Sequence, residues 1–147
     1  MITFVKKDAL EVKEEKVIIA HVVNDRGGWG KGFVLSISEK WSTPEQIYRN
    51  SKKLKLGDVQ FVPVENNVTV ANMVAQKGYK NIYNPVPLCY ASLESCLTKL
   101  DDFAKLIKAD IQIPFKMGAG LAGGDWNKIL EIIKKVVSVN VVVCQKL

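Results

Sequence analysis

The chain has 147 residues, of which 48% are hydrophobic and 24% are charged, and its net charge is +6. This length suits one domain with a hydrophobic core, and the composition argues against a disordered chain. No apolar run approaches the ~18 residues of a membrane-spanning helix, and the N-terminal residues lack the pattern of a signal peptide. We therefore expect a single domain over residues 1–147 that is cytoplasmic and contacts no membrane.

The cysteines and the lysines argue against a metal-binding, a disulfide-rich or a nucleic-acid-binding protein. Cys89, Cys96 and Cys144 are widely spaced and the chain has one histidine, so we expect neither a metal site nor a disulfide framework. We expect Cys96 and Cys144 to be buried. Many lysines occur as scattered pairs typical of solvated helix faces, with no basic run interleaved with aromatic residues. The charge favours an anionic ligand, and nucleic acid is not the expected one.

Six segments rich in valine, isoleucine and phenylalanine predict β-strands. Several are near-continuous apolar runs, as expected for strands that are covered on both faces. Asn66 and Asn67, between the third and the fourth segment, predict the turn of a β-hairpin. The six segments cover residues 2–6, 16–23, 58–64, 68–75, 111–115 and 140–145.

Helical patterns fall between these strands. Apolar residues recur at spacings of three and four over residues 93–107, and Ser92 is the expected cap of this helix. Further helices are expected over residues 31–40, in a segment opened by Pro44, and from about Asp125 onward. The alternation predicts an α/β fold, a three-layer α/β/α sandwich around a mixed sheet of about six strands.

Two glycine-rich loops each follow a predicted strand and precede a predicted helix. The first is NDRGGWGKGF, residues 24–33, and the second is GAGLAGGDW, residues 118–126. In α/β sheets, ligands bind beyond the carboxyl ends of strands, where helix N-termini offer free N–H groups. Each loop alone could be a short turn, but two such loops suit a ligand with two phosphates.

Two familiar phosphate motifs do not apply to these loops. A Walker A loop is excluded because neither loop reads GxxxxGK[ST]: Lys31 lies between Gly30 and Gly32, and Phe33 follows. GAGLAG matches GxGxxG, but a Rossmann fingerprint needs a second βαβ half and an acidic residue ~20 residues later. The residues around Val143 are apolar, so the Rossmann interpretation fails.

Three polar residues near strand ends are candidates for chemistry, and each has a structural alternative. His21, three residues before Asn24, is either a packed core histidine or an acid–base group. Asp125 either caps the last helix or presents a carboxylate to the ligand. Lys77 is either solvated, or it meets an anion or acts as a nucleophile.

Taken together, the motifs resemble those of the macrodomain family, the ADP-ribose-binding module. The resemblance is carried by FVKKDAL, by IIAHVVNDRGGWGKGF and, most specifically, by IPFKMGAGLAGGDW. It implies a monomer that binds ADP-ribose or a derivative and needs no cofactor, with ADP-ribosylated macromolecules as further partners. The binding residues that it implies are Asp8, Ala9, Asn24, Gly28, Trp29, Gly30, Lys31, Gly32, Phe33, Met117, Gly118, Ala119, Gly120, Leu121, Ala122 and Gly123.

The resemblance also assigns parts of the ligand to these residues. Asp8 falls on the acidic position that contacts adenine, although Lys7 replaces the family's glycine. Asn24 falls on the asparagine at the ribose side. Residues 28–33 would cover one phosphate and the distal ribose, and residues 118–123 the other phosphate, since glycine backbones can approach a diphosphate closely.

Within the family, the chain looks closest to the compact branch of the yeast-type ADP-ribose-1″-phosphate phosphatases and the terminal ADP-ribose protein glycohydrolases. In the phosphatases, a histidine and the aspartate of Gly-Asp-Trp are the suspected catalytic pair, and they match His21 and Asp125. The glycohydrolases use a lysine near the place of Lys77, and an aspartate where this chain has Ala122. The implied reaction is hydrolysis of ADP-ribose 1″-phosphate. Removal of ADP-ribose from macromolecules and recognition without catalysis are the alternatives.

Overall fold

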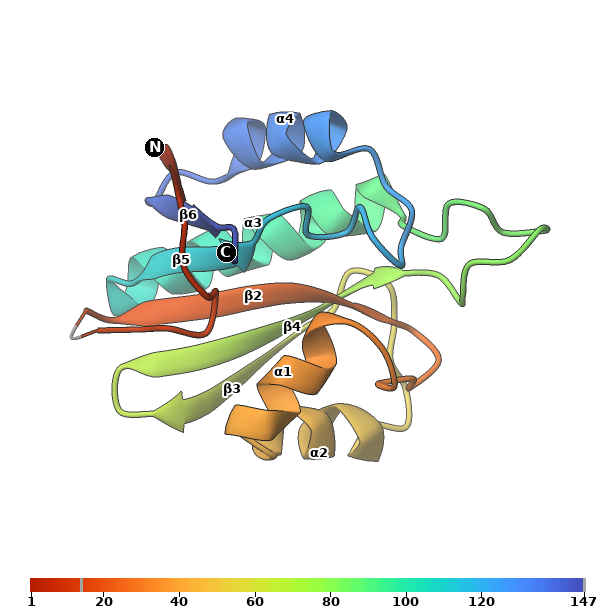
Figure 1. The fold of residues 1–147 in the computed structure, drawn as a ribbon, viewed down its shortest axis with the longest axis horizontal. Helices are drawn as coiled ribbons and strands as arrows, with labels where there is room; N and C mark the ends of the chain where they lie inside the picture. The colour runs from red at the N-terminus through yellow and green to blue at the C-terminus, as the bar shows by residue number, and fades with distance from the viewer. Residues whose placement is uncertain (14, 147) are drawn as a thin grey trace.

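The computed structural model describes residues 1–13 and 15–146, which form a six-stranded sheet with helices on both faces (Figure 1). The strands are β1 (Ile2–Val5), β2 (Val17–Asn24), β3 (Val59–Glu65), β4 (Val68–Gln76), β5 (Asp110–Pro114) and β6 (Val141–Cys144). The helices are α1 (Phe33–Lys40), α2 (Thr43–Asn50), α3 (Tyr90–Ile107) and α4 (Trp126–Val136).

The strand order in the sheet is β1-β6-β5-β2-β4-β3. β3 runs antiparallel to β4, and every other neighbouring pair is parallel, so the sheet is mixed as predicted. The six predicted strands are confirmed to within one residue at each end. The hairpin is confirmed as well, since Asn66 and Asn67 join the antiparallel strands β3 and β4.

Two predicted helix starts were wrong. α3 begins at Tyr90 rather than near Ser92, because the carbonyl of Cys89 already accepts a helical hydrogen bond from the Leu93 amide at 2.9 Å. The Ser92 hydroxyl instead donates to Cys89 Sγ at 3.0 Å. α1 begins at Phe33 rather than at Lys31, because Gly32 has a φ of 84° and lies outside the helical region.

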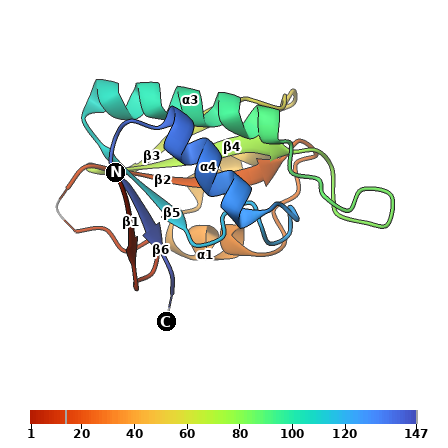
Figure 2. The ribbon, with the colours of Figure 1, turned by 90° about the horizontal axis from the view of Figure 1, so that it is seen from above.

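The helices form two layers, with α3 and α4 on one face of the sheet and α1 and α2 on the other (Figures 1 and 2). Successive residues of β2 alternate between these layers. Ile18 and Ala20 pack in the core beneath α3 and α4, whereas Ile19 and Val23 pack against α1 and α2. The same alternation turns His21 toward the layer of α1 and α2.

The middle of the sheet contains a point where the connections change face. β5, β2 and β4 are adjacent and parallel, so their carboxyl ends lie at one edge of the sheet. β2 leads to α1 on one face, whereas β4 and β5 lead to α3 and α4 on the other. Ligands in open α/β sheets bind in the crevice that such a change of direction creates.

Other predictions concern the core and the membrane. Cys96 and Cys144 are buried, as expected. Among the described residues, no helix is both long and apolar enough to cross a bilayer.

Candidate functional site

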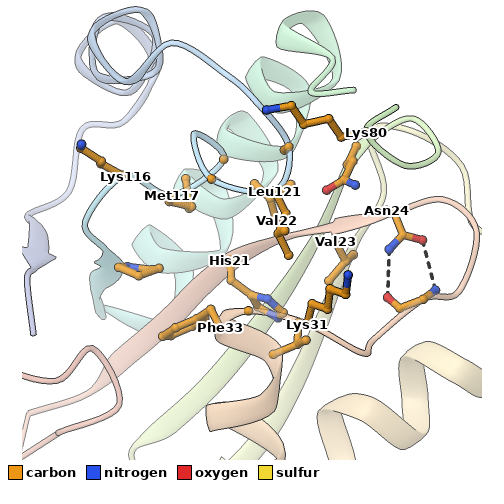
Figure 3. A pocket seen from close by; sticks show the side chains of 18 of the residues that line it. His21, Val22, Val23, Asn24, Lys31, Phe33, Lys80, Lys116, Met117 and Leu121 are labelled. Carbon is orange, nitrogen blue, oxygen red and sulfur yellow. Dashed lines mark hydrogen bonds between the residues drawn. The ribbon is translucent and has the colours of Figure 1, made fainter. Parts of the chain in front are cut away.

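A pocket of about 680 Å³ lies at the carboxyl ends of β5, β2 and β4. Its volume falls within the ~300–1,000 Å³ of typical small-molecule sites. Its walls come from the end of β2, from the loops that follow β2, β4 and β5, and from the start of α1 (Figure 3). Segments far apart in the sequence therefore meet around one cavity.

The structure brings most of the residues that the sequence implied to this pocket. They come from the end of β2 and from both glycine-rich loops. They are His21, Asn24, Gly28, Gly30, Lys31, Gly32, Phe33, Met117, Gly118, Gly120, Leu121 and Ala122.

The remaining residues of the sequence-based set do not line the pocket: Asp8, Ala9, Trp29, Lys77, Ala119, Gly123 and Asp125. Asp8 accepts a hydrogen bond from the Leu10 amide at 2.9 Å and pairs with Lys146 at 3.5 Å, beside a separate depression. Trp29 is only 2% exposed, and its indole N–H donates to Ser38 Oγ at 2.7 Å. The Trp29 ring therefore packs in the core and supports the first glycine-rich loop from inside the protein.

Asp125 and Lys77, which the sequence suggested for chemistry, also lie outside the pocket lining. The Asp125 carboxylate caps α4, because its Oδ1 accepts a hydrogen bond from the Asn127 amide at 2.9 Å. Of the two roles that the sequence left open, this is the structural one. Lys77 is exposed, and its backbone amide donates to the carbonyl of Pro87 at 2.8 Å.

Asn24 organises the first glycine-rich loop from the end of β2. Its Oδ1 accepts hydrogen bonds from the amides of Arg26 and Gly28 and from the Tyr48 hydroxyl, at 2.9, 3.2 and 2.9 Å. Its Nδ2 donates to the carbonyl of Gly28 at 2.9 Å (Figure 3). The oxygen is thus fully used within the protein, and only the second Nδ2 proton is left for a ligand.

The glycines of the two loops divide into two kinds. Gly118 and Gly123 have φ angles of 79° and 68°, which other residues rarely adopt, and a Cβ on Gly124 would lie 2.7 Å from the Gly118 carbonyl oxygen. The fold itself therefore requires these glycines. Gly30 and Gly120 have no positive φ, and a Cβ on either would meet nothing within 4 Å. Both line the pocket, so their bare backbones leave space there.

The pocket wall carries positive charge. Lys31, Lys80 and Lys116 line it from three different loops (Figure 3), and no aspartate or glutamate among residues 1–13 and 15–146 does so. The N-terminus of α1 also points to this wall, since Gly32, Phe33 and Val34 are lining residues and no side chain caps the helix. Lysine charges and free helix N–H groups together favour an anion.

The second glycine-rich loop adds hydrogen-bond donors. Within the described part of the chain, the amides of Gly118, Gly120, Leu121 and Ala122 donate to no other protein group. All four residues line the pocket. Successive free amides in a turn form a concave site for phosphate-like oxygens.

His21 lies at the pocket wall beneath the first loop, 2% exposed. Its ring meets that of Trp29 edge-on at 5.4 Å and that of Phe33 at 5.9 Å. Burial lowers the pKa of His21 to about 4, although its hydrogen bond to Asn72 acts in the opposite direction. The imidazole is therefore neutral at physiological pH and adds no charge to the pocket.

Sequence reasoning missed several lining residues. Tyr79 and Lys80 follow β4, and Phe115 and Lys116 follow β5. The available signal was their position, at or shortly after the ends of two predicted strands; that these strands are parallel and central comes from the structure. Asn72, the partner of His21, was missed as well, although a fully buried asparagine inside the apolar run VTVANMVA is itself a signal.

No grouping of three or more histidine, cysteine, aspartate or glutamate side chains suited to a metal ion occurs in residues 1–13 and 15–146. The polar side chains of the pocket are those of three lysines, one histidine, Asn24, Gln76 and Tyr79, and backbone amides add further donors. This donor set matches an organic anion.

Comparison with solved structures gives two similar chains of the same length. A protein of unknown function from Bacteroides thetaiotaomicron is 40% identical, with a TM-score of 0.92 over 99% of this chain and 98% of that one. A macrodomain protein from Streptomyces coelicolor is 37% identical, with a TM-score of 0.84 over 98% of both chains. At 16% identity, Thermosipho africanus DarTG in complex with ADP-ribose shares the fold, with a TM-score of 0.70 over 87% of this chain and 37% of that one.

Among curated proteins, the mouse chromodomain-helicase-DNA-binding protein 1-like is 31% identical over 134 residues. The match covers 83% of this chain but only 15% of the mouse protein, and the zebrafish counterpart is matched over 13% of its length. The chain thus spans a small part of these relatives. No family model matches the sequence.

The Streptomyces comparison decides the family, because 37% identity extends over nearly the full length of both chains. The sheet order, the two helix layers and the pocket at the carboxyl ends agree with the fold expected from the motifs. The chain belongs to the macrodomain family.

Proposed function

We propose that the chain binds ADP-ribose, or a derivative of it, in the pocket between the two glycine-rich loops. One observation carries this proposal. Gly30 and Gly120 line the pocket from opposite loops, and neither the backbone angles nor the packing of the chain requires a glycine at either position. A ligand that approaches the backbone closely supplies the missing reason.

The chemistry of the walls supports a diphosphate as the centre of that ligand. Lys31, Lys80 and Lys116 supply positive charge. The free amides of Gly118, Gly120, Leu121 and Ala122 supply donors for phosphate oxygens. The complex of DarTG with ADP-ribose, which shares the fold, makes ADP-ribose the first ligand to try.

Titration calorimetry with ADP-ribose tests the proposal. We expect saturable binding at one site per chain, and weaker binding of AMP, which lacks the diphosphate and the second ribose. Lys31→Gln and Lys80→Gln should each weaken binding, whereas Lys108→Gln, on the αL cap of α3, is the matched control. Absence of any heat with ADP-ribose at millimolar concentration would reject the proposal.

We further propose that the chain hydrolyses ADP-ribose 1″-phosphate and belongs to the compact branch of the family named above. The support is His21, a neutral imidazole at the pocket wall that could orient the distal ribose that carries the 1″-phosphate. The Asp125 carboxylate caps α4 outside the pocket lining. A test of its part in the reaction therefore needs a variant that keeps the cap but removes the base.

Asp125→Asn is that variant, because asparagine caps a helix as well as aspartate does but is not a base. Phosphate release from ADP-ribose 1″-phosphate should fall in His21→Ala, and in Asp125→Asn if the carboxylate acts in chemistry. No phosphate release by the wild type would reject this activity and leave binding intact. Equal release by the wild type and both variants would reject the assignment to His21 and Asp125.

A second candidate is action on ADP-ribose attached to a macromolecule. The segment after β4 projects from the body of the molecule beside the pocket (Figures 1 and 2), and its Ile82 and Tyr83 are 85% and 90% exposed. An apolar tip next to a ligand pocket suits a carrier chain. Ile82→Ser should then weaken binding of an ADP-ribosylated peptide but not of free ADP-ribose. Adduct trapping with mass spectrometry would show whether Lys77, or Lys80 in the pocket wall, acts as a nucleophile.

A further inference from the structure

His21 and Asn72 form a buried pair between the two central strands. They are register partners of the parallel strands β2 and β4, so their side chains lie on the same face of the sheet. His21 Nε2 lies 2.6 Å from Asn72 Oδ1, and Asn72 is fully buried. Such a contact between a ring nitrogen and an oxygen requires that the nitrogen carries the proton.

The orientation of the Asn72 amide is itself determined by its neighbours. Asn72 Nδ2 donates to the carbonyl of Pro44 at 3.2 Å and to Gln60 Oε1 at 3.1 Å. A backbone carbonyl can only accept, so the Asn72 nitrogen must face Pro44 and its oxygen must face His21.

The chain of hydrogen bonds continues to a backbone anchor. Gln60 Nε2 donates to Ser51 Oγ at 2.6 Å, and Ser51 Oγ donates to the carbonyl of Ile47 at 2.8 Å. Every donor and acceptor along this path therefore has one consistent direction. The direction ends at His21 with a proton on Nε2 and a lone pair on Nδ1.

That lone pair is the exception in the structure. Among the buried side-chain nitrogen and oxygen atoms of the described residues, only His21 Nδ1 has no hydrogen-bond partner. An unpaired buried acceptor destabilises a fold, so such an atom needs an explanation. His21 belongs to the pocket wall (Figure 3), where a ligand can supply the missing donor.

We propose that Asn72 is a positioning residue that holds His21 in the Nε2–H tautomer, so that Nδ1 accepts a hydrogen bond from a hydroxyl group of the bound ligand. The proposal rests on the proposed function, under which the donor is a ribose hydroxyl of ADP-ribose. The half-buried ring of Phe33, at the start of α1, lies 5.9 Å from the imidazole and lines the same pocket.

This arrangement sorts the two chemical parts of the ligand. A neutral acceptor repels phosphate oxygens and attracts hydroxyl groups, whereas the lysines and the free amides of Gly118, Gly120, Leu121 and Ala122 attract phosphate oxygens. The sugar is therefore directed to the end of β2 and the phosphates to the second glycine-rich loop. Asn72 affects the orientation of the ligand without touching it.

Nitrogen NMR of the histidine ring tests the first half of the proposal directly. The chain has a single histidine, so ¹⁵N-histidine labelling gives one pair of ring signals without assignment. At pH 7 the wild type should show a protonated Nε2 and an unprotonated Nδ1, and saturation with ADP-ribose should shift the Nδ1 signal. A proton on Nδ1, a mixture of tautomers, or an Nδ1 signal that ADP-ribose leaves unchanged would overturn the proposal.

Variants of Asn72 test the second half. Asn72→Leu should give a tautomer mixture and about tenfold weaker ADP-ribose binding, the loss of one good hydrogen bond. Asn72→Asp keeps an acceptor beside Nε2 and should therefore keep the proton on Nε2. Asp101→Asn, which alters a buried carboxylate that binds Ser138 at the other end of the sheet, is the control and should change neither measurement.

The outcomes separate this proposal from the proposed function. If the wild type binds ADP-ribose and Asn72→Leu binds it equally well, Asn72 has no positioning role and ADP-ribose binding stands. If the wild type does not bind ADP-ribose, the proposed function fails, and the ligand role of Nδ1 falls with it.

Discussion

The Tyr48 hydroxyl lies 2.6 Å from the backbone oxygen of Asn24 and 2.9 Å from its side-chain Oδ1. Tyr48 is fully buried in α2, whereas Asn24 ends β2 and starts the first glycine-rich loop. One hydroxyl group thus joins the helix layer to the loop that walls the pocket. The shape of the loop depends on a residue that never contacts the pocket.

Tyr48→Phe should therefore make the first glycine-rich loop less ordered while the aromatic ring still fills its place in the core. We expect the free energy of unfolding to fall by about 1–2 kcal/mol, because the buried oxygens of Asn24 lose the one proton that the hydroxyl shares between them. ADP-ribose binding should weaken as well. Urea denaturation and calorimetry measure the two effects, with Tyr83→Phe, at a 90% exposed position, as the control. Unchanged stability and affinity in Tyr48→Phe would show that the contact is dispensable.

His21 predicts a pH dependence of stability. Its pKa is about 4 in the folded chain and 6.5 in an unperturbed histidine, so the unfolded chain binds more protons between these values. Stability is then fully present above pH 6.5 and falls as the pH falls toward 4. The loss between pH 7.5 and pH 5 should be about 2 kcal/mol.

Urea denaturation at both pH values measures this loss in the wild type and in His21→Gln. Since the chain has one histidine, the variant should lose markedly less stability than the wild type over this range. The same loss in both proteins would assign it to other groups.

The three cysteines should differ in reactivity. The Ser92 hydroxyl, 3.0 Å from Sγ, lowers the pKa of Cys89, and the thiol is only half-buried. Burial raises the pKa of Cys96 to about 12 and also raises that of Cys144. Iodoacetamide at neutral pH should therefore modify Cys89 first, as peptide mass spectrometry would show. Ser92→Ala should slow this reaction, and preferential labelling of Cys96 would contradict the burial described here.

The cap of α4 should contribute measurably to stability. Asp125→Ala removes the acceptor of the Asn127 amide, so we expect the free energy of unfolding to fall by about 1 kcal/mol. Asp125→Asn keeps an acceptor and should stay close to the wild type in thermal and urea unfolding. If both variants lose the same stability, the charge at the helix N-terminus matters more than the hydrogen bond.

Much of the fold could be predicted because its signals are local. The strands β2 and β4 are apolar runs ended by polar residues, and the Asn66-Asn67 turn lies between two such runs. The start of α3 was missed because a helix boundary depends on which carbonyl accepts the first bond, here that of Cys89. A preferred residue type such as Ser92 does not determine it.

The parts of the site that lie within one loop could be predicted from the sequence. The parts that depend on how separate loops are brought together could not. Both glycine-rich loops were found from their composition. Lys80 and Tyr79 were missed because only the sheet order, with β4 beside β2, brings their loop to the same edge. The position of Asp125 outside the pocket lining could not be predicted either, because no sequence pattern states which way an N-cap carboxylate points.

The most direct measurement is the affinity of Gly120→Ala for ADP-ribose, compared with its stability. Gly120 has open space around its missing Cβ and no positive φ, so alanine should leave stability unchanged or raise it by about 0.5 kcal/mol. Gly123→Ala is the contrast, because its φ is 68° and a Cβ would lie 2.8 Å from the Pro85 carbonyl oxygen, so it should lose stability.

If ADP-ribose lies against the second glycine-rich loop, calorimetry should show at least tenfold weaker binding for Gly120→Ala, a loss of ~1.4 kcal/mol, in a protein that unfolds like the wild type. Gly30→Ala should behave in the same way on the opposite wall. Binding of ADP-ribose by Gly120→Ala with wild-type affinity would contradict the placement of the ligand between the two loops.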